Sequence, residues 1–274
     1  MNILFTICGR AGSKGIKNKN IRNLLDKPLV YWTLSAIDLF LRYQKCCRNL
    51  NYNIALNTDS KELKDLVEKN NMLKVDYVER KGSLAGDVVG KIDVIRDTYY
   101  NMKIRYNIDY NVIVDLDITS PLRKRQDIEN LITKYIEANV NVVYSVTESR
   151  RNPYFNMVER DKTGKIKKVI NSQFTSRQQA PIVYDMNASL YAYSPKFLNN
   201  NLQLFDAKSE IIEMEDTAVL DLDKPSDFEL MEVLANYFVN NNQNYSEVYQ
   251  NIVIIWLCYS VNIDNNNKKC FIKY

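Results

Sequence analysis

The chain has 274 residues, a length that fits one large α/β domain or a domain with a small appendage. Its 37 lysines and arginines face 33 aspartates and glutamates, and this near balance argues against a nucleic-acid-binding protein. Histidine is absent, which excludes Ser-His-Asp triads, Cys-His pairs and histidine-ligated zinc. Any catalytic acid, base or metal ligand must therefore be Asp, Glu, Lys, Tyr or Cys.

The cysteines show no disulfide framework and no CxxC pair, and we interpret them as reduced thiols. No basic region followed by a secretory apolar segment is visible at the N-terminus. No apolar run approaches the about 20 residues that a membrane helix needs. The sequence thus predicts a cytoplasmic protein that binds neither membranes nor nucleic acids.

Strand and helix patterns alternate over the first 150 residues. A strand is expected first, then a basic loop and a helix; the ranges are 3–8, 9–20 and 28–41. Further alternating strands and helices are expected at 53–58, 60–70, 74–79, from 88, 110–117, around 128–136, and 141–147. This β-α-β order predicts a Rossmann-like fold, with a mainly parallel sheet and helices on both faces.

The alternation breaks after residue 150. Residues 153–170 read as a hairpin, with Lys162-Thr163-Gly164 near its tip. Strands at 188–194, 210–215 and 217–223 follow, and then a helix from Pro225 to about Phe238. We interpret 150–187 as a small β-rich insertion, a dimerisation or sugar-side element, within a domain that spans 1–240. Residues 241–274 are Asn-rich and are interpreted as a low-complexity appendage without an identified packing partner.

Glycines and cations gather in the loop at 9–20, directly after the first expected strand. Its glycines allow the backbone to approach phosphate oxygens, and backbone N–H groups with Arg10, Lys14, Lys17 and Lys19 would neutralise them. Loops in this place are where α/β sheets bind ligands. The glycine spacing matches neither a P-loop nor a dinucleotide fingerprint. The pattern predicts a phosphate-binding loop, with a solvated basic loop as the alternative.

Two aspartates, Asp221 and Asp223, precede the last expected helix. Side chains two positions apart on a strand share one face, so both carboxylates can bind one Mg²⁺. The alternative is that Asp223 caps the helix that starts at Pro225.

A second aspartate pair, Asp115 and Asp117, also shares a strand face, and Thr119, Ser120 and Arg123 lie in the loop beyond it. Here the alternative is a helix entry with one structural aspartate.

A further polar stretch runs from 176 to 189. Arg177, Gln178 and Gln179 precede an Ala-Pro pair, and Asn187 opens a β-rich segment. Arginine can pair with a carboxylate through two hydrogen bonds, although a surface loop is the alternative.

In this order and at these separations, the motifs resemble the acylneuraminate cytidylyltransferase (CMP-sialate synthetase) family. The resemblance covers about residues 2–238 and rests on GRAGSKGIKNKNIRNLLDKPLVYWTLSA, RKGSLAGDVVGKIDVIRD, DITSPLR, RQQAP…MNASLYAY and LDLDKPSDFEL. It implies a nucleotidyltransferase fold and a homodimer. It also implies that CTP and an acidic nine-carbon-type sugar, with Mg²⁺ as cofactor, give a CMP-sugar and pyrophosphate.

The resemblance also implies roles for individual residues. Catalytic roles fall on Arg10, Lys19 and Asp221. Nucleotide binding falls on Gly9, Arg10, Gly12, Ser13, Lys14, Asn20 and Arg80. Sugar binding falls on Asp117, Thr119, Ser120, Arg177, Gln178 and Asn187. Metal binding falls on Asp221 and Asp223.

The chain departs from the family pattern in its sugar-side motif. Asp117-Ile118 stands where many members have Gln before PTSPLR, and Lys91 and Asp93 replace small hydroxylated residues of some members. Asp117 could bind hydroxyls or an amine, or help to hold the metal. The sequence does not separate sialic, legionaminic and pseudaminic acid as the sugar.

Two alternative functions remain open at this point. A Kdo cytidylyltransferase is one, although that group usually has a shorter loop with a Leu-Pro-Gly turn before Lys-Pro-Leu. A non-catalytic nucleotide- or sugar-binding module on the same fold is the other.

Overall fold

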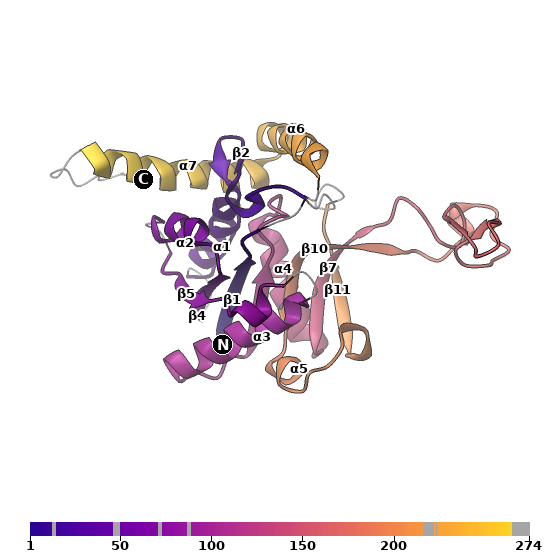
Figure 1. Cartoon of the computed structure of the whole chain (residues 1–274), viewed down its shortest axis with the longest axis horizontal. Coiled ribbons are helices and arrows are strands. Elements are labelled where there is room, and N and C mark those ends of the chain that lie inside the picture. The colour runs from indigo at the N-terminus through magenta and orange to yellow at the C-terminus, as the bar shows by residue number, and fades with distance from the viewer. Residues whose placement is uncertain are drawn as a thin grey trace.

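A central β-sheet with helices on both faces forms the body of the protein (Figure 1). The structure is a computed structural model, and it describes residues 1–12, 15–45, 50–70, 73–86, 89–215, 222 and 224–264. The alternation of strands and helices that the sequence predicts is present from the first strand onward.

The main sheet has seven strands in the order β11-β7-β10-β6-β1-β4-β5. Their bounds are β1 (Asn2–Gly9), β4 (Asn51–Thr58), β5 (Asp76–Glu79), β6 (Val112–Leu116), β7 (Val142–Glu148), β10 (Tyr184–Tyr193) and β11 (Ser209–Glu213). All paired strands run parallel except β10, which is antiparallel to both β6 and β7. The prediction of a mainly parallel sheet is therefore confirmed. The strand expected at 217–223 lies, apart from Leu222, outside the described residues.

Each face of the sheet has its own helical layer. One face is covered by α1 (Leu29–Lys45), α2 (Lys61–Glu68) and α4 (Arg125–Ala138), together with α6 (Pro225–Asn241) and α7 (Gln243–Asp264). The other is covered by α3 (Lys91–Tyr106) and α5 (Pro195–Asn199). A separate apolar cluster fills the space beneath each layer, because alternate residues of the buried strands point to opposite faces. The two-layer arrangement leaves the strand ends open for a site.

The segment after residue 240 differs from the expectation of an appendage without a packing partner. Over 243–253 it forms the first part of α7, and Tyr245, Val248 and Ile252 are buried in the core cluster that includes α1. Ser35 of α1 donates a hydrogen bond to the Val248 carbonyl at 2.7 Å, and Asn251 donates to Ser35 Oγ at 3.1 Å. Between its Asn-rich flanks the segment forms an amphipathic helix, and the apolar face of this helix packs against α1.

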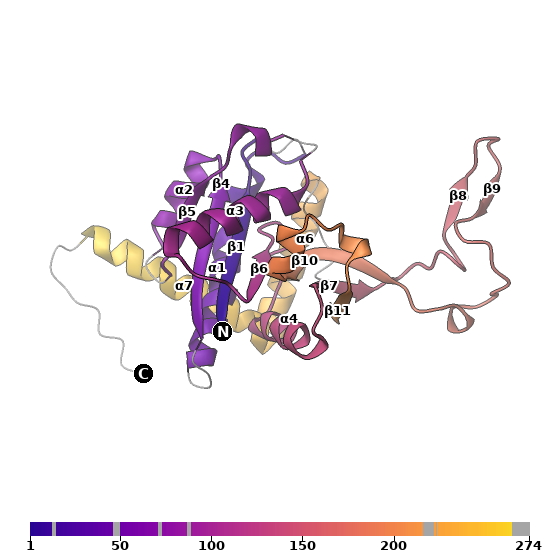
Figure 2. The same ribbon diagram turned by 90° about the horizontal axis from the view of Figure 1, so that it is seen from below.

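A long extension joins β7 to β10. Residues 149–183, which we call the arm, leave the body and project well away from it (Figure 2). The arm carries the antiparallel strands β8 (Val158–Arg160) and β9 (Ile166–Lys168). Gly164 turns the chain between them with a φ of +87°, a value that favours glycine. The expected hairpin is confirmed, although Tyr184–Asn187 belong to β10 rather than to an insertion.

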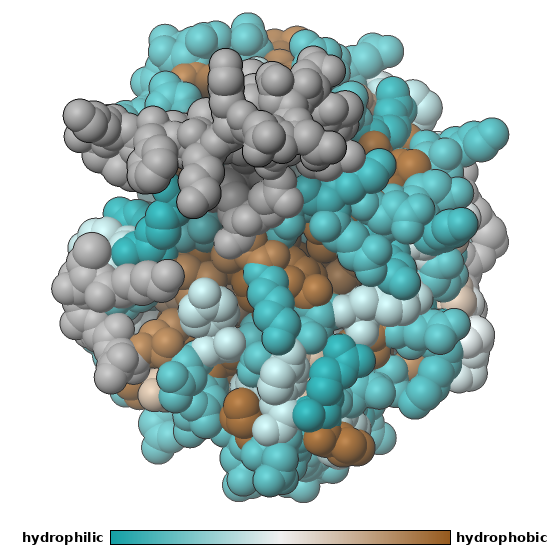
Figure 3. Space-filling model, turned by 90° about the vertical axis from the view of Figure 1, so that its left-hand side faces the viewer, coloured by the Kyte–Doolittle hydropathy of each residue, from teal (hydrophilic) through white to brown (hydrophobic). Residues whose placement is uncertain are grey.

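A smaller hairpin, β2 (Asn23–Leu24) with β3 (Lys27–Pro28), leads into α1. Hydrophilic side chains cover most of the face seen in Figure 3, and apolar side chains gather in a hollow near its centre. Among the helices within the described ranges, none combines the length and the apolar character that crossing a bilayer requires.

The burial of α7 predicts a specific loss of stability. Ile252 is fully buried, so Ile252→Ala should lower the free energy of unfolding by about 2 to 5 kcal/mol, measured by urea denaturation. Leu230→Ala on α6 is the matched control. Because Leu230 is 48% exposed, this change should lower the free energy of unfolding by about 0.5 kcal/mol or less. Equal, small effects of the two changes would mean that α7 does not contribute to the fold.

Candidate active site

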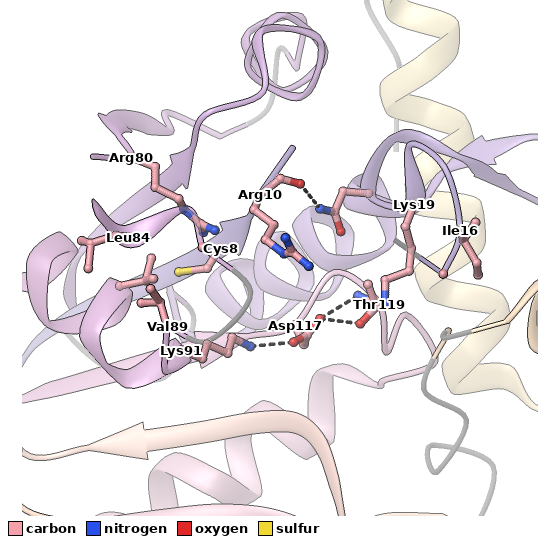
Figure 4. A pocket seen from close by; sticks show the side chains of 14 residues that line it. Cys8, Arg10, Ile16, Lys19, Arg80, Leu84, Val89, Lys91, Asp117 and Thr119 are labelled. Carbon is pink, nitrogen blue, oxygen red and sulfur yellow. Dashed lines mark hydrogen bonds and ion pairs between the residues drawn. The ribbon is translucent and has the colours of Figure 1, made fainter. Parts of the chain in front are cut away.

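A cavity of about 320 Å³ opens at the carboxyl ends of β1, β5 and β6 (Figure 4). Three stretches that are far apart in the sequence meet there: the loop after β1, the stretch from the end of β5 into the start of α3, and the loop after β6. The lining residues are Cys8, Arg10, Gly15, Ile16, Lys19, Asn20, Arg80, Leu84, Gly86, Val89, Lys91, Val94, Asp117 and Thr119. Ligands of open α/β sheets bind at this edge.

The loop after β1 is held in place by close packing and hydrogen bonds. A Cβ atom on Gly9 would lie only 2.6 Å from Leu63 Cδ2 and 2.9 Å from Ile118 Cδ1, so a larger residue there would force these side chains or the backbone to shift. Gly12 has a φ of +69°, which few other residues adopt readily. Asn20 donates a hydrogen bond to the Arg10 carbonyl at 3.1 Å. The glycines and Asn20 therefore shape the loop, and of these three only Asn20 lines the cavity.

Three predicted site residues bring positive charge to the cavity. Arg10 and Lys19 extend into it from the loop after β1 (Figure 4). Arg80 is oriented by two hydrogen bonds to Asn57. Its Nε donates to the side-chain oxygen of Asn57 at 2.9 Å, and its Nη2 donates to the backbone carbonyl of Asn57 at 3.2 Å. Such a concentration of cations suits a polyanionic ligand such as a triphosphate. Ser13 and Lys14, predicted for the same role, lie outside the described residues.

A charged cluster of Lys91, Asp115 and Asp117 lies beside these cations. Lys91 Nζ is 2.7 Å from Oδ2 of Asp115 and 2.7 Å from Oδ2 of Asp117. Asp115 is fully buried, and its Oδ1 accepts a hydrogen bond from Thr6 Oγ1 at 2.7 Å. Asp117 and Lys91 are partly exposed and line the cavity. The ammonium between the two carboxylates offsets their mutual repulsion.

The electrostatics of the cluster favour its charged form. Burial works against ionisation of Asp117, but the Lys91 ammonium and the hydrogen bonds from Thr119 hold its pKa well below the usual range. Burial likewise works against the charged form of Lys91, yet the Asp115 and Asp117 carboxylates raise its pKa well above the usual value. Asp117 is therefore a weak base, and Lys91 stays protonated at neutral pH.

The loop after β6 is anchored from below by Arg123. Its fully buried guanidinium donates to Ser189 Oγ at 3.2 Å, to Thr33 Oγ1 at 3.1 Å, and to the carbonyls of Asp117 and Ser120. Burial lowers the pKa of Arg123 to about 10, so the group remains charged near neutral pH. One side chain thus ties the Asp117 loop to α1 and β10.

Thr119 and Asp117, both predicted to bind the sugar, lie together on one wall of the cavity. Asp117 Oδ1 accepts hydrogen bonds from the Thr119 N–H and from Thr119 Oγ1, both at 2.8 Å. Ser120, expected beside them, is buried, and its hydroxyl donates to the Asn187 carbonyl at 3.4 Å. It supports the wall instead of lining it.

The other predicted sugar residues do not line this cavity. Asn187 is buried in a bulge of β10, where its Oδ1 accepts from Ser145 Oγ at 2.5 Å. Arg177 and Gln178 lie exposed on the arm, and Arg177 donates to the Arg150 carbonyl. Within this chain the arm carries both residues away from the cavity (Figure 2). Their role in sugar binding stays a prediction.

Cys8 lines the cavity but is not a nucleophile. Burial, reinforced by the charge of Asp115, raises the pKa of its thiol far above the usual value. A protonated thiol reacts poorly, so the site contains no activated cysteine among its described residues.

The predicted metal ligands Asp221 and Asp223 lie outside the described residues. Within the described ranges, no group of three or more Cys, Asp or Glu side chains could hold a metal ion. Asp115 and Asp117 do not fit a metal either, because the Lys91 ammonium already occupies the position between them. The described part of the cavity contributes cations, and the binding of a metal by Asp221 and Asp223 stays a prediction.

Sequence reasoning did not assign Lys91 to the site, although a signal was present. A lysine at the first position of a helix opposes the helix dipole, which favours negative charge there. Two aspartates on one face of a buried strand also require a cation nearby. Taken together, these two features of the sequence predict an ion pair of Lys91 with Asp115 and Asp117. The apolar lining residues, such as Leu84 and Val89, carry no comparable signal.

Comparison with known proteins places these features in a family. A model of the cytidylyltransferase family matches residues 4–254, which extends past residue 238 into α7. Post-translational flagellin modification protein B of Campylobacter coli is 33% identical over 232 residues, covering 85% of this chain and 94% of that protein. CMP-N,N'-diacetyllegionaminic acid synthase of Campylobacter jejuni is 32% identical over 232 residues, with the same coverage.

Solved structures show the same fold at lower identity. A CMP:2-keto-3-deoxy-manno-octonic acid synthetase in complex with CTP aligns with a TM-score of 0.57 and 12% identity. The alignment covers 86% of this chain and 99% of that chain. The expected nucleotidyltransferase fold is thus confirmed.

The cavity predicts which lysine of the first loop binds phosphate. Lys19→Ala should weaken the binding of CTP about tenfold to a hundredfold, because it removes a charge-assisted contact, as measured by isothermal titration calorimetry. Lys17→Ala is the matched control, since Lys17 belongs to the same loop but is exposed and outside the lining. Equal losses in the two variants would indicate a diffuse electrostatic effect and would contradict the assignment.

Proposed function

Because the chain belongs to the cytidylyltransferase family and is a nucleotidyltransferase, we propose that it transfers CMP from CTP to a nonulosonic, sialic-acid-like 2-keto acid sugar. The observation that carries this proposal is the cavity at the strand ends, where Arg10, Lys19 and Arg80 meet the Asp117 loop. The names of two relatives, a CMP-N,N'-diacetyllegionaminic acid synthase and the N-acylneuraminate cytidylyltransferase of Streptococcus agalactiae, support this class of sugar.

In the proposed reaction, the anomeric hydroxyl of the sugar attacks the α-phosphorus of CTP. A new P–O bond forms, the bond between the α-phosphorus and the bridging oxygen breaks, and pyrophosphate leaves with the released charge. Arg10, Lys19 and the amides of the first loop would hold the β- and γ-phosphates and stabilise that charge. Arg80, fixed by Asn57, would bind near the cytosine.

The hydroxyl proton needs an acceptor, and the described residues limit the choice. Asp117 is a weak base because its pKa is held low, and Cys8 keeps its proton. We assign the proton to Asp221 or to a metal-assisted route, as the family resemblance implies. Mg²⁺ on Asp221 and Asp223 is part of the proposal, and when bound it would lower the pKa of the attacking hydroxyl.

The proposal is tested by pyrophosphate release from CTP with a panel of acidic sugars: N-acetylneuraminate, N,N'-diacetyllegionaminate, pseudaminate and Kdo. Release is expected with at least one nonulosonate, with CTP preferred over the other nucleoside triphosphates, and it should stop when EDTA is added. Asp221→Asn and Lys19→Ala should each lower turnover about a hundredfold or more, the typical loss for one transition-state contact.

Three results would speak against this function. Activity with Kdo alone would favour the Kdo-type alternative, and CTP binding without turnover on any sugar would favour a binding module. Wild-type turnover in both Asp221→Asn and Lys19→Ala would contradict the assigned mechanism.

We further propose that two copies associate through the arm. Val158, Ile166 and Ile182 are 62%, 51% and 69% exposed, and apolar side chains so far from the body are expected to be covered by another surface. A partner's arm could then bring its Arg177 toward the sugar. We expect the enzyme to act in the cytoplasm.

The arm proposal predicts the oligomeric state. Wild-type protein should elute as a dimer in size-exclusion chromatography with light scattering, and Val158→Asp with Ile166→Asp should give a folded monomer. Val233→Asp on α6 is the control, because Val233 is 66% exposed on the body and its change should leave the dimer intact. A monomeric wild-type protein would contradict the proposal.

A further inference from the structure

Asp59 lies beside the loop after β1, outside the residues that line the cavity. It directly follows β4, whose parallel register with β1 pairs Thr58 with Gly9. The first residues after the two strands, Arg10 and Asp59, therefore start side by side. Oδ1 of Asp59 accepts a hydrogen bond from the Ala11 N–H at 2.7 Å. A turn at the end of one strand thus holds the loop at the end of its neighbour.

This hydrogen bond and the one from Asn20 hold opposite sides of the same peptide group. The Arg10 carbonyl and the Ala11 N–H belong to one trans peptide unit, in which they point in opposite directions. Asn20 Nδ2 donates to the carbonyl at 3.1 Å, and Asp59 accepts from the N–H. Because both ends of the peptide plane are bonded, the peptide cannot rotate without losing both contacts.

The turn that carries Asp59 is ordered by contacts of its own. Ser60 caps α2, where its Oγ accepts from the Leu63 N–H at 3.2 Å. The Ser60 N–H donates to Oγ1 of Thr58 at 3.0 Å, and Thr58 is fully buried. Asp59 is exposed, but it is held between a core residue and a helix cap. Support of this kind fixes the loop through contacts within the protein.

The fixed peptide adjoins a cationic side chain of the cavity. Arg10 extends into the cavity from the Cα atom next to this peptide, so a rotation of the peptide would redirect the start of the side chain (Figure 4). Charge alone makes the Asp59 carboxylate unfavourable for a polyanionic ligand nearby. Any benefit of Asp59 for the binding of such a ligand therefore has to come from its hydrogen bond to the loop.

We propose that Asp59 is a positioning residue of the site: it acts through the Arg10–Ala11 peptide to hold Arg10 in the orientation that binds the phosphates of CTP. The inference rests on the proposed function, because it takes these phosphates as the ligand of Arg10. Asp59 has no contact with the ligand in this role. Its acceptor oxygen carries the effect and its charge does not, so asparagine should replace aspartate at this position.

Two substitutions separate the hydrogen bond from the charge. Asp59→Ala removes both, whereas Asp59→Asn keeps an acceptor oxygen and removes the charge. The dissociation constant of CTP, measured by isothermal titration calorimetry, should rise about tenfold in Asp59→Ala and stay within about threefold of wild type in Asp59→Asn. Glu62→Ala is the control and should bind CTP as the wild type does, because the exposed Glu62 carboxylate accepts from Ser60 Oγ on α2's first turn.

A double-mutant cycle tests whether Asp59 acts through Arg10. In an Arg10→Ala background, Asp59→Ala should weaken CTP binding by less than about threefold, because the side chain that Asp59 orients is gone. A general structural role of the turn would instead give the same loss with and without Arg10. Urea denaturation of each variant checks that the fold is retained.

Unchanged or tighter CTP binding by Asp59→Ala would overturn the inference, because the charge would then outweigh the hydrogen bond. Equal losses in Asp59→Ala and Asp59→Asn, or equal losses in the two Arg10 backgrounds, would overturn it as well. In these cases the inference fails alone, since the wild-type protein still binds CTP and transfers CMP. A wild-type protein that does not bind CTP would overturn the proposed function, and the inference with it.

Discussion

The ammonium group of Lys91 lies between the carboxylates of Asp115 and Asp117 and offsets the repulsion between them. Asp115 is the next-to-last residue of the fully buried strand β6 and has no access to solvent, and Asp117 lies just beyond the strand at the cavity. The contact joins the first residue of α3 to the central strand β6, so it fixes one wall of the cavity to the core of the sheet. The shape of the site and its charge therefore depend on the same three side chains.

The cavity combines two regions of opposite character. Arg10 and Lys19 supply positive charge from a loop whose path is set by glycine conformation and by Asn20. The cluster around Lys91 supplies a negative net charge and fixed hydrogen-bonding groups a short distance away. This division suits a reaction that joins a polyanionic nucleotide to a second substrate, because the triphosphate is drawn to one region and kept from the other.

The sequence predicts the parallel sheet and the basic loop because both depend on local patterns: short apolar runs, helical spacing, and glycines after a strand. It predicts Asp117 and Thr119 at the cavity for the same reason. Lys91 was noted only as a departure, because its role follows from charges that meet across 24 positions of sequence in the folded chain. The packing of α7 was missed since Asn-rich flanks mask a buried face that includes Ile252. Burial of Ser120 likewise depends on a neighbouring strand that local patterns do not reveal.

Arg123 has a consequence for the energetics of ligand binding. Its guanidinium is bonded to two carbonyls of the loop and to hydroxyl groups of α1 and β10, so contacts within the protein hold the backbone beneath Asp117 in place. A substrate that meets this wall spends little free energy on ordering it, so more of the contact energy appears as affinity. Preorganisation of this kind resides in a fully buried residue outside the cavity lining, and a sequence comparison restricted to lining residues would overlook it.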